Sequence, residues 1–119
     1  MTVETTRSTP KARVRHWCEV CGWAIEPGET YARVVRFYDG TASTWKNHVS
    51  PCQTAINRAW AAEYHDGDDG VSDDDISEWA SGNRDTDEVA AEIHRRLEIN
   101  AENSRAHREA LARIEGQRQ

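Results

Sequence analysis

The sequence predicts the α+β class: a small mixed domain, then a short acidic helix and a long C-terminal helix. Cysteine and histidine recur in two closely spaced pairs in the first half of the chain. A stretch rich in β-branched and aromatic residues reverses at Asp39-Gly40, as in a hairpin. Two acidic capping clusters, at 72–75 and 85–88, each precede a helical pattern. The expected units are an N-terminal arm (1–12), the mixed domain (13–65), an acidic linker with a short helix (66–84) and the long helix (85–119).

The two cysteine and histidine pairs have the chemistry and spacing of metal ligands. Cys18 and Cys21 form a CxxC turn, and His48 and Cys52 follow as HxxxC. Gly22 can take the positive φ that such a turn, a zinc knuckle, requires. Three thiolates and one imidazole are a ligand set typical of structural zinc, and they leave no coordination position open for catalysis. The sequence therefore predicts a structural Zn²⁺ cofactor.

Two alternatives stay open for these side chains. Cys18 and Cys21 could instead form a redox pair or serve as small buried residues, although no βαβ pattern surrounds them. His16, two residues before Cys18, is a rival for the fourth ligand position.

The second ligand pair falls between a predicted hairpin and a predicted helix. The two strands of the predicted hairpin are residues 30–38 and 41–45. Ser50, Pro51 and Gln53 suit the N-cap, the first helical position and the third position of a capping box. A helix from Pro51 to about residue 64 is therefore expected, with Cys52 in its first turn.

Knuckle, hairpin and helix in this order, with ligands Cys18, Cys21, His48 and Cys52, resemble the treble-clef zinc fingers. The resemblance covers residues 16–64. It implies a zinc-dependent fold but no single function, since such fingers bind DNA, RNA or protein, and some nucleases use them for catalysis. Asn47-His48 is superficially similar to the HNH nucleases, but His48 is already assigned to zinc and no second His or Asp pair completes a catalytic metal site. We therefore expect no enzymatic activity.

The charge of the chain is unevenly distributed. Residues 1–62 carry eight basic and five acidic side chains, whereas residues 63–88 carry one and eleven. A basic face on the finger would bind phosphate, although a merely solvated surface explains the same residues. The candidate nucleic-acid-binding residues are Arg13, Arg15, Arg33, Arg36 and Lys46.

The acidic linker predicts a capped helix. Ser72 is a suitable N-cap, and Asp73, Asp74 and Asp75 favour the positive end of a helix dipole. A calcium loop over residues 66–75 is a weaker interpretation, because the final Glu is missing. Among the five tryptophans, Trp17 and Trp79 are the expected exposed ones, while Trp23, Trp45 and Trp60 are expected to be structural.

The long C-terminal helix carries an interrupted coiled-coil seam. Positions at alternating spacings of four and three are apolar at the ends and polar in the middle: Ile93, Leu97, Asn100, Ser104, His107, Leu111 and Ile114. This pattern predicts a homodimer or a partner helix, and the alternative is a helix folded back on the finger. The candidate partner-binding residues are Asp73, Asp74, Asp75, Trp79, Ile93, Leu97, Leu111 and Ile114.

These features together predict a non-enzymatic, zinc-stabilised regulatory module that binds another protein through its acidic segment and C-terminal helix. A nucleic-acid-binding regulator is the alternative, and an HNH-like nuclease is a more distant one. The odd number of cysteines and the lack of a long apolar run predict a cytoplasmic protein without a membrane segment. Frequent Arg and Ala, with only Lys11 and Lys46 as lysines, are typical of a GC-rich genome such as that of an actinobacterium or its phage.

Overall fold

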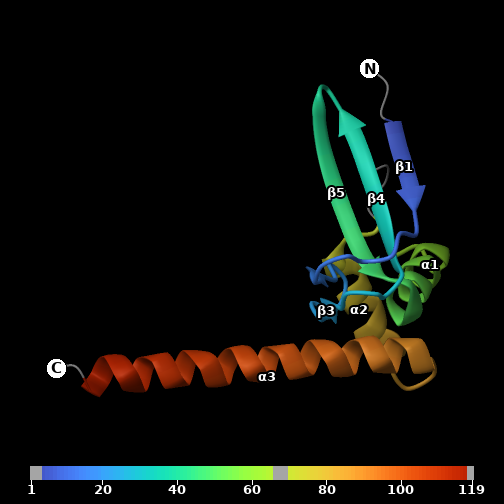
Figure 1. The fold of residues 1–119 in the computed structure, drawn as a ribbon. Coiled ribbons are helices and arrows are strands. Elements are labelled where there is room, and N and C mark those ends of the chain that lie inside the picture. Colours follow the sequence, from blue (N-terminus) through green and yellow to red (C-terminus); the bar gives the residue numbers. More distant parts are fainter. Residues whose placement is uncertain (1–3, 66–69, 118–119) are drawn as a thin grey trace.

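The computed structural model describes residues 4–65 and 70–117, and it has the expected α+β architecture. Figure 1 shows a tall sheet above a cluster of short elements, with one long helix, α3, running beneath them. The strands are β1 (Glu4–Ser8), β2 (His16–Trp17), β3 (Ala24–Ile25), β4 (Tyr31–Tyr38) and β5 (Thr41–His48). The helices are the π-type turn η1 (Val49–Gln53), α1 (Thr54–Ala61), α2 (Asp73–Asn83) and α3 (Glu88–Gln117).

The predicted hairpin is present as β4 and β5. Its tight turn is Asp39-Gly40, where both residues have positive φ, of 51° and 77°, as a two-residue turn between right-twisted strands requires. On its other edge β4 pairs with β1, giving the order β1-β4-β5. We expected a simple arm over residues 1–12. Instead Glu4 to Ser8 pair antiparallel with Phe37 to Arg33, because this Thr-containing segment satisfies the open backbone edge of β4.

The knuckle is a second, very short antiparallel pair. His16 lies opposite Ile25 and Trp17 opposite Ala24. The turn between them is closed by hydrogen bonds from the Cys18 N–H to the Trp23 carbonyl and from the Gly22 N–H to the Cys18 carbonyl. Gly22 has φ +74°, the left-handed conformation expected from its place after CxxC.

The capping prediction at Ser50 was wrong. Ser50 is extended (φ −136°, ψ 135°) inside η1, no side chain caps the N-terminus of α1, and α1 begins only at Thr54. Cys52 therefore lies in the turn before the helix. The C-terminus of α1 also comes early, since Glu63 takes φ +64°. The N–H groups of Glu63 and Tyr64 then bond to the carbonyls of Trp60 and Ala59, which is a Schellman ending.

The capping predictions for the later helices were largely correct. The Ser72 hydroxyl accepts from the Asp75 N–H while the Asp75 carboxylate accepts from the Ser72 N–H, a complete capping box for α2. Within the second cluster the cap is Asp87, which accepts from the N–H groups of Val89 and Ala90 at 2.9 and 3.2 Å. The helix α3 therefore begins at Glu88, three residues after the expected start at 85. The helix α2 ends at Asn83, whose side-chain amide donates back to the Trp79 carbonyl at 2.8 Å.

A small core joins the three helices to the knuckle. It contains two alanines of α1, Ile76, Trp79 and Ala80 of α2, Ala90 and Ile93 of α3, and Ile25 of β3. Trp79 is only 3% exposed and Ile93 is fully buried. The expectation that Trp79 is exposed was therefore wrong, and neither residue is available to a partner. Trp60, expected to be structural, is exposed, whereas Trp17 is exposed as expected.

The helix α3 divides into a docked half and a projecting half. In the docked half, Ile93 is buried and Leu97 packs against the core. Residues 101–117 are exposed except for the half-buried Ala110, and this half extends away from the rest of the molecule (Figure 1). The helix is thus folded back on the knuckle and the other helices only in its N-terminal half.

Candidate metal centre

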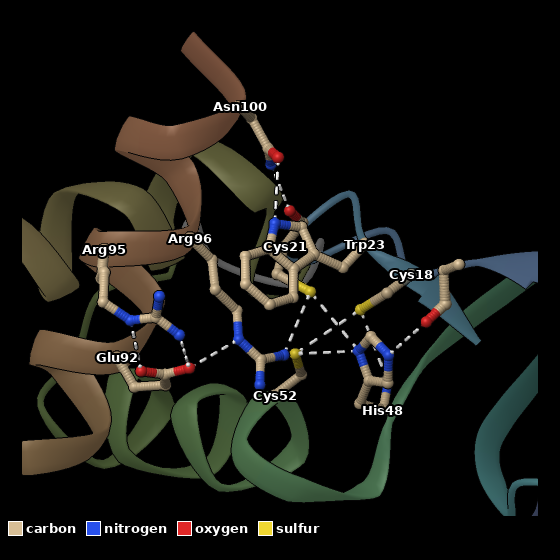
Figure 2. A network of polar contacts seen from close by, with 10 residues as sticks. Cys18, Cys21, Trp23, His48, Cys52, Glu92, Arg95, Arg96 and Asn100 are labelled. Carbon is tan, nitrogen blue, oxygen red and sulfur yellow. Dashed lines mark hydrogen bonds and ion pairs between the residues drawn. The ribbon is translucent and has the colours of Figure 1, made fainter. Parts of the chain in front are cut away.

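Four predicted ligands from separate elements converge at one buried point. Cys18 and Cys21 come from the knuckle, His48 is the last residue of β5, and Cys52 lies in η1. One ligand atom from each lies within 4.8 Å of all the others, and all four residues are buried. The antiparallel hairpin brings the end of β5 back to the knuckle, so the ligand pairs meet although they are far apart in sequence (Figure 2).

The distances match the edges of a small tetrahedron. The Sγ atoms of Cys18 and Cys52 are 3.5 Å apart, and His48 Nδ1 lies 3.4 Å from Cys21 Sγ and 3.6 Å from Cys52 Sγ. Zinc bonds of about 2.3 Å to sulfur and about 2.0 Å to nitrogen give tetrahedral edges of about 3.5 to 3.8 Å. The donor set and its spacing therefore fit a tetrahedrally coordinated metal ion.

The orientation of His48 suits a metal ligand. Its Nε2 lies 3.0 Å from the Ala24 carbonyl oxygen. Since a carbonyl only accepts, Nε2 carries the proton and Nδ1 presents its lone pair to the three sulfurs. A hydrogen bond from the remote ring nitrogen fixes the tautomer and the ring orientation, as is usual around metal-binding histidines. The Glu29 carboxylate, 3.6 Å from the same Nε2, supports this tautomer.

The three thiols need a cation if all of them are to ionise. Hydrogen bonds from Cys18 and Cys52 lower the pKa of Cys21, and the Arg96 guanidinium adds to this effect. Hydrogen bonds with Cys18 and, second, with Cys21 raise the pKa of Cys52. The hydrogen bond with Cys21 raises the pKa of Cys18. Protein groups alone thus favour one thiolate, whereas a bound divalent cation stabilises three and displaces the remaining protons.

The rival ligand lies outside the cluster. His16 Nδ1 is 3.2 Å from the Lys46 ammonium nitrogen, and its ring packs on Tyr31 with the centroids 5.1 Å apart. In the part of the chain that the structure describes, the Cys18, Cys21, His48 and Cys52 group is the one cluster with metal-ligating geometry.

Sequence reasoning missed the contacts from α3 that cover this centre (Figure 2). Asn100 donates from Nδ2 to the Cys21 carbonyl and accepts at Oδ1 from the Trp23 indole N–H at 3.0 Å. Arg96 donates to Cys21 Sγ at 3.7 Å, and its guanidinium lies 4.6 Å from the centre of the Trp23 ring. Glu92 accepts from both Arg96 and Arg95. One available signal was Asn100, the first polar residue of the seam after the apolar Ile93 and Leu97.

Gly22 permits this close approach. A Cβ atom built there would lie 3.1 Å from Asn100 Nδ2. The glycine thus serves both the turn and the docking of α3 on the knuckle.

The predicted basic residues do not form a single surface. Arg33 and Lys46 face each other across the hairpin, because they are partners in the β4–β5 register. Arg36 lies on the opposite face of the sheet, since it is an odd number of residues from Arg33. Arg13 and Arg15 precede β2, and Arg15 forms an ion pair with Glu26 at 3.2 Å.

The acidic candidates lie at the start of α2. Asp73 and Asp74 are exposed, while Asp75 is half-buried and engaged in the capping box. Residues 66–69, which carry the first part of the considered calcium loop and the start of the acidic linker, lie outside the described residues.

Comparison with protein-family models, with curated proteins and with solved structures gave no match. Among the described helices, none combines the length and the apolar character needed to cross a bilayer.

Proposed function

We propose that this chain is a non-enzymatic interaction module whose fold is stabilised by one zinc ion and whose partner-binding surface is the projecting half of α3. The single observation that carries the proposal is the division of α3. Its first half is fixed to the candidate metal centre by Asn100 and Arg96, while its second half leaves apolar side chains in solvent. Such an arrangement presents a helix rigidly to another molecule.

Zinc is the metal that the donor chemistry favours. Three thiolates and one imidazole suit a borderline-soft d¹⁰ ion, and four protein ligands leave no coordination position for water or substrate. The order of knuckle, hairpin and helix supports a treble-clef-like arrangement with a structural ion. The same closed ligand set supports a binding role over a catalytic one.

The proposed partner surface is a stripe on the projecting helix. Leu111 and Ile114 are 46% and 48% exposed, and with Ser104 and His107 they continue the seam of Ile93 and Leu97 along one face. Exposed apolar residues on one helix stripe are typical of helix–helix recognition. The partner is a helix of another protein or a second copy of this chain, and Asp73 and Asp74 add an acidic surface beside the core.

A paired-variant experiment tests this proposal. We expect Leu111→Ser combined with Ile114→Ser to abolish association, measured by light scattering for self-association and by capture of binding proteins from a host lysate. The matched control is Ala106→Ser combined with Arg113→Ser, on the same helix but off the seam. Circular dichroism establishes that both variants keep their helices. Equal association of the two variants and the unmodified chain, in light scattering and in capture, would contradict the proposal.

A further inference from the structure

A cleft between the sheet and α1 combines two arginines, two tryptophans and several carboxamides. Its volume is about 660 Å³, and its lining includes Arg7, Arg36, Trp45, Asn47, Asn57 and Trp60. Sites for small ligands usually have volumes of about 300 to 1,000 Å³ and contain a few convergent polar groups. The cleft lies on the sheet face opposite to Arg33 and Lys46. Its lining includes none of the four candidate metal ligands and no residue of α3, although Asn47 and Gln53 adjoin two of those ligands in the chain.

The strand register explains why these side chains converge. Arg7 pairs with Val34, which pairs with Trp45, so that one row crosses β1, β4 and β5. Arg36 is two residues beyond Val34 on the same face, and it is therefore a diagonal neighbour of both Arg7 and Trp45. The floor of the cleft thus places two guanidinium groups beside an indole.

The helix α1 supplies the opposite wall. Trp60 is 51% exposed, and its ring stacks on His65 with the centroids 4.3 Å apart and the planes at 21°. On the floor, the Trp45 indole N–H donates to Asn47 Oδ1 at 2.9 Å. Both indoles are therefore held in place before any ligand arrives. Gln53 and Asn57, linked by a 3.1 Å hydrogen bond, add amide groups between them.

The charge in the cleft favours an anion at the sheet end. Within the described residues, neither Arg7 nor Arg36 forms an ion pair with a carboxylate. Among the lining residues that the structure describes, Glu19 is the one carboxylate, and it accepts from the Lys46 backbone N–H, so it is engaged with the edge of β5. Ser72 also lines the cleft, and the acidic first turn of α2 follows it in the chain.

We propose that this cleft binds a nucleoside phosphate, either free or within a single-stranded nucleic acid. The phosphate binds Arg7 and Arg36, because guanidinium forks match phosphate oxygens. The base stacks on an indole, and amide groups of Asn57 and Gln53 bond to its edge. The arginines lie on the sheet and Trp60 lies on α1, so the phosphate points towards the sheet and the base towards α1. A nucleoside phosphate fits this cleft because its phosphate matches the two arginines and its base matches the two indole rings.

The test measures binding to the full-length zinc-loaded chain by fluorescence anisotropy. The probe is a short fluorescein-labelled oligothymidylate at low salt. The competitors are the unlabelled oligothymidylate, thymidine monophosphate and a polyaspartate peptide. We expect Arg36→Ala, Arg7→Ala and Trp60→Ala each to weaken binding by about tenfold or more, since stacking and phosphate contacts have this magnitude. The controls Arg13→Ala and Arg33→Ala remove the same charge outside the cleft and should change binding by less than about twofold.

Salt dependence gives a second readout. Two phosphate contacts on a single strand predict a slope of about −1.4 for log affinity against log salt, and Arg36→Ala should reduce its magnitude by about half. Thermal unfolding and zinc content confirm that each variant is folded. Leu111→Ser with Ile114→Ser should leave binding unchanged, so the outcome is independent of the proposed helix surface.

The competitors identify the source of the ligand. Monophosphate competition comparable to that of the oligonucleotide supports a free nucleotide, and competition by the oligonucleotide alone supports a single strand. No measurable binding, equal losses from Arg33→Ala and Arg36→Ala, or stronger competition by polyaspartate than by either nucleotide would overturn the proposal.

Discussion

At the scale of single residues, Arg96 links the sulfur of Cys21 to the rest of the protein. Its guanidinium donates to Cys21 Sγ, stacks over Trp23 and is held by Glu92. Hydrogen bonds to a thiolate ligand stabilise its charge and fix its position, and the loss of such supporting contacts typically costs about 10–100-fold in metal affinity.

We therefore predict that Arg96→Met weakens zinc binding by about tenfold. Methionine keeps an apolar stem of similar length, so packing changes little. The matched control is Arg95→Met, because Arg95 also lies over Trp23 and bonds to Glu92 but has no contact with sulfur. Competition against a chromophoric chelator measures both variants. Similar zinc affinities for the two variants would show that the Arg96 contact with sulfur does not contribute.

The sequence could predict the ligand residues but not their supporting residues. CxxC and HxxxC are local spacings, and their chemistry is legible without the fold. Arg96 and Asn100 are separated from Cys21 by 75 and 79 positions, so no local pattern connects them. Trp79 was misjudged for a related reason: the short helix that carries it is covered by α3, and that packing depends on the whole fold.

At the scale of elements, Asn100 distinguishes two views of α3. As a member of a coiled-coil seam it would weaken pairing, and Leu would strengthen association. In the structure it connects α3 to the knuckle through Cys21 and Trp23. We predict that Asn100→Leu lowers the free energy of unfolding by roughly 1–3 kcal/mol, because it leaves buried polar groups unpaired.

The control for that substitution is Asn103→Leu, on an exposed position of the same helix. It should change the free energy of unfolding by less than about 0.5 kcal/mol. Denaturant titration of the zinc-loaded protein measures both. A stabilised Asn100→Leu variant would instead favour the seam interpretation.

Asp87 connects the start of α3 to α1. It caps α3, and its carboxylate accepts from Arg58 at 2.7 Å. Partial burial raises its pKa, but the backbone bonds from Ala90 and Val89 and the charge of Arg58 outweigh this, so the pKa lies below the ordinary 3.8. We predict that Asp87→Ala costs about 1 kcal/mol of stability at neutral pH. Asp85→Ala, at an exposed position before the cap, is the control.

The lowered pKa of Asp87 also fixes the pH dependence of that difference. A carboxyl group with a lower pKa in the folded state stabilises the fold above its unfolded pKa and loses this effect as the pH falls. The difference in the free energy of unfolding between Asp87→Ala and the unmodified chain should thus stay constant from about pH 7 to pH 5. It should shrink only below pH 3.8. Equilibrium unfolding across this range measures it. A difference that already changes between pH 7 and 5 would assign the effect to another group.

Capping signals explain which helix boundaries were predictable. Ser72 and Asp87 cap helices whose first residues belong to no metal cluster, so local chemistry decides where these helices begin. Ser50 follows His48 by two residues and precedes Cys52 by two, and both of these residues belong to the metal cluster. His48 and Cys52 converge on one point, and the turn that joins them, η1, delays the start of α1 to Thr54. The tertiary site therefore overrides the local preference for a cap at Ser50.

At the scale of the whole molecule, the protein has little core for its length. Its radius of gyration is 17.1 Å, compared with about 13.5 Å for a compact domain of this size. The hairpin tip and the second half of α3 make few contacts with the rest of the molecule, so the elements depend on the region around the four ligands. The metal centre and the docked half of α3 are thus expected to fold as one unit.

We predict that removing zinc with a strong chelator lowers both the melting temperature and the helix content. The knuckle opens when three thiols lose their cation, and Asn100 and Arg96 then lose their partners on Cys21. The projecting half of α3 is an exposed helix that depends on the docked half for nucleation, since isolated helices of this length are marginal in water. The loss of helix should therefore extend well beyond the ligand-bearing segment, and circular dichroism measures it.

A ligand variant provides the control for the chelator. Cys52→Ala should already resemble the chelated protein, and the chelator should change it no further, because one of its four ligands is missing. Restoring zinc to the unmodified chain should restore its helix content, but not that of the variant. Unchanged helix content in the chelated protein would mean that α3 and the knuckle fold independently of the ion, and the contacts of Asn100 and Arg96 would then be a consequence of the fold rather than a link to the metal.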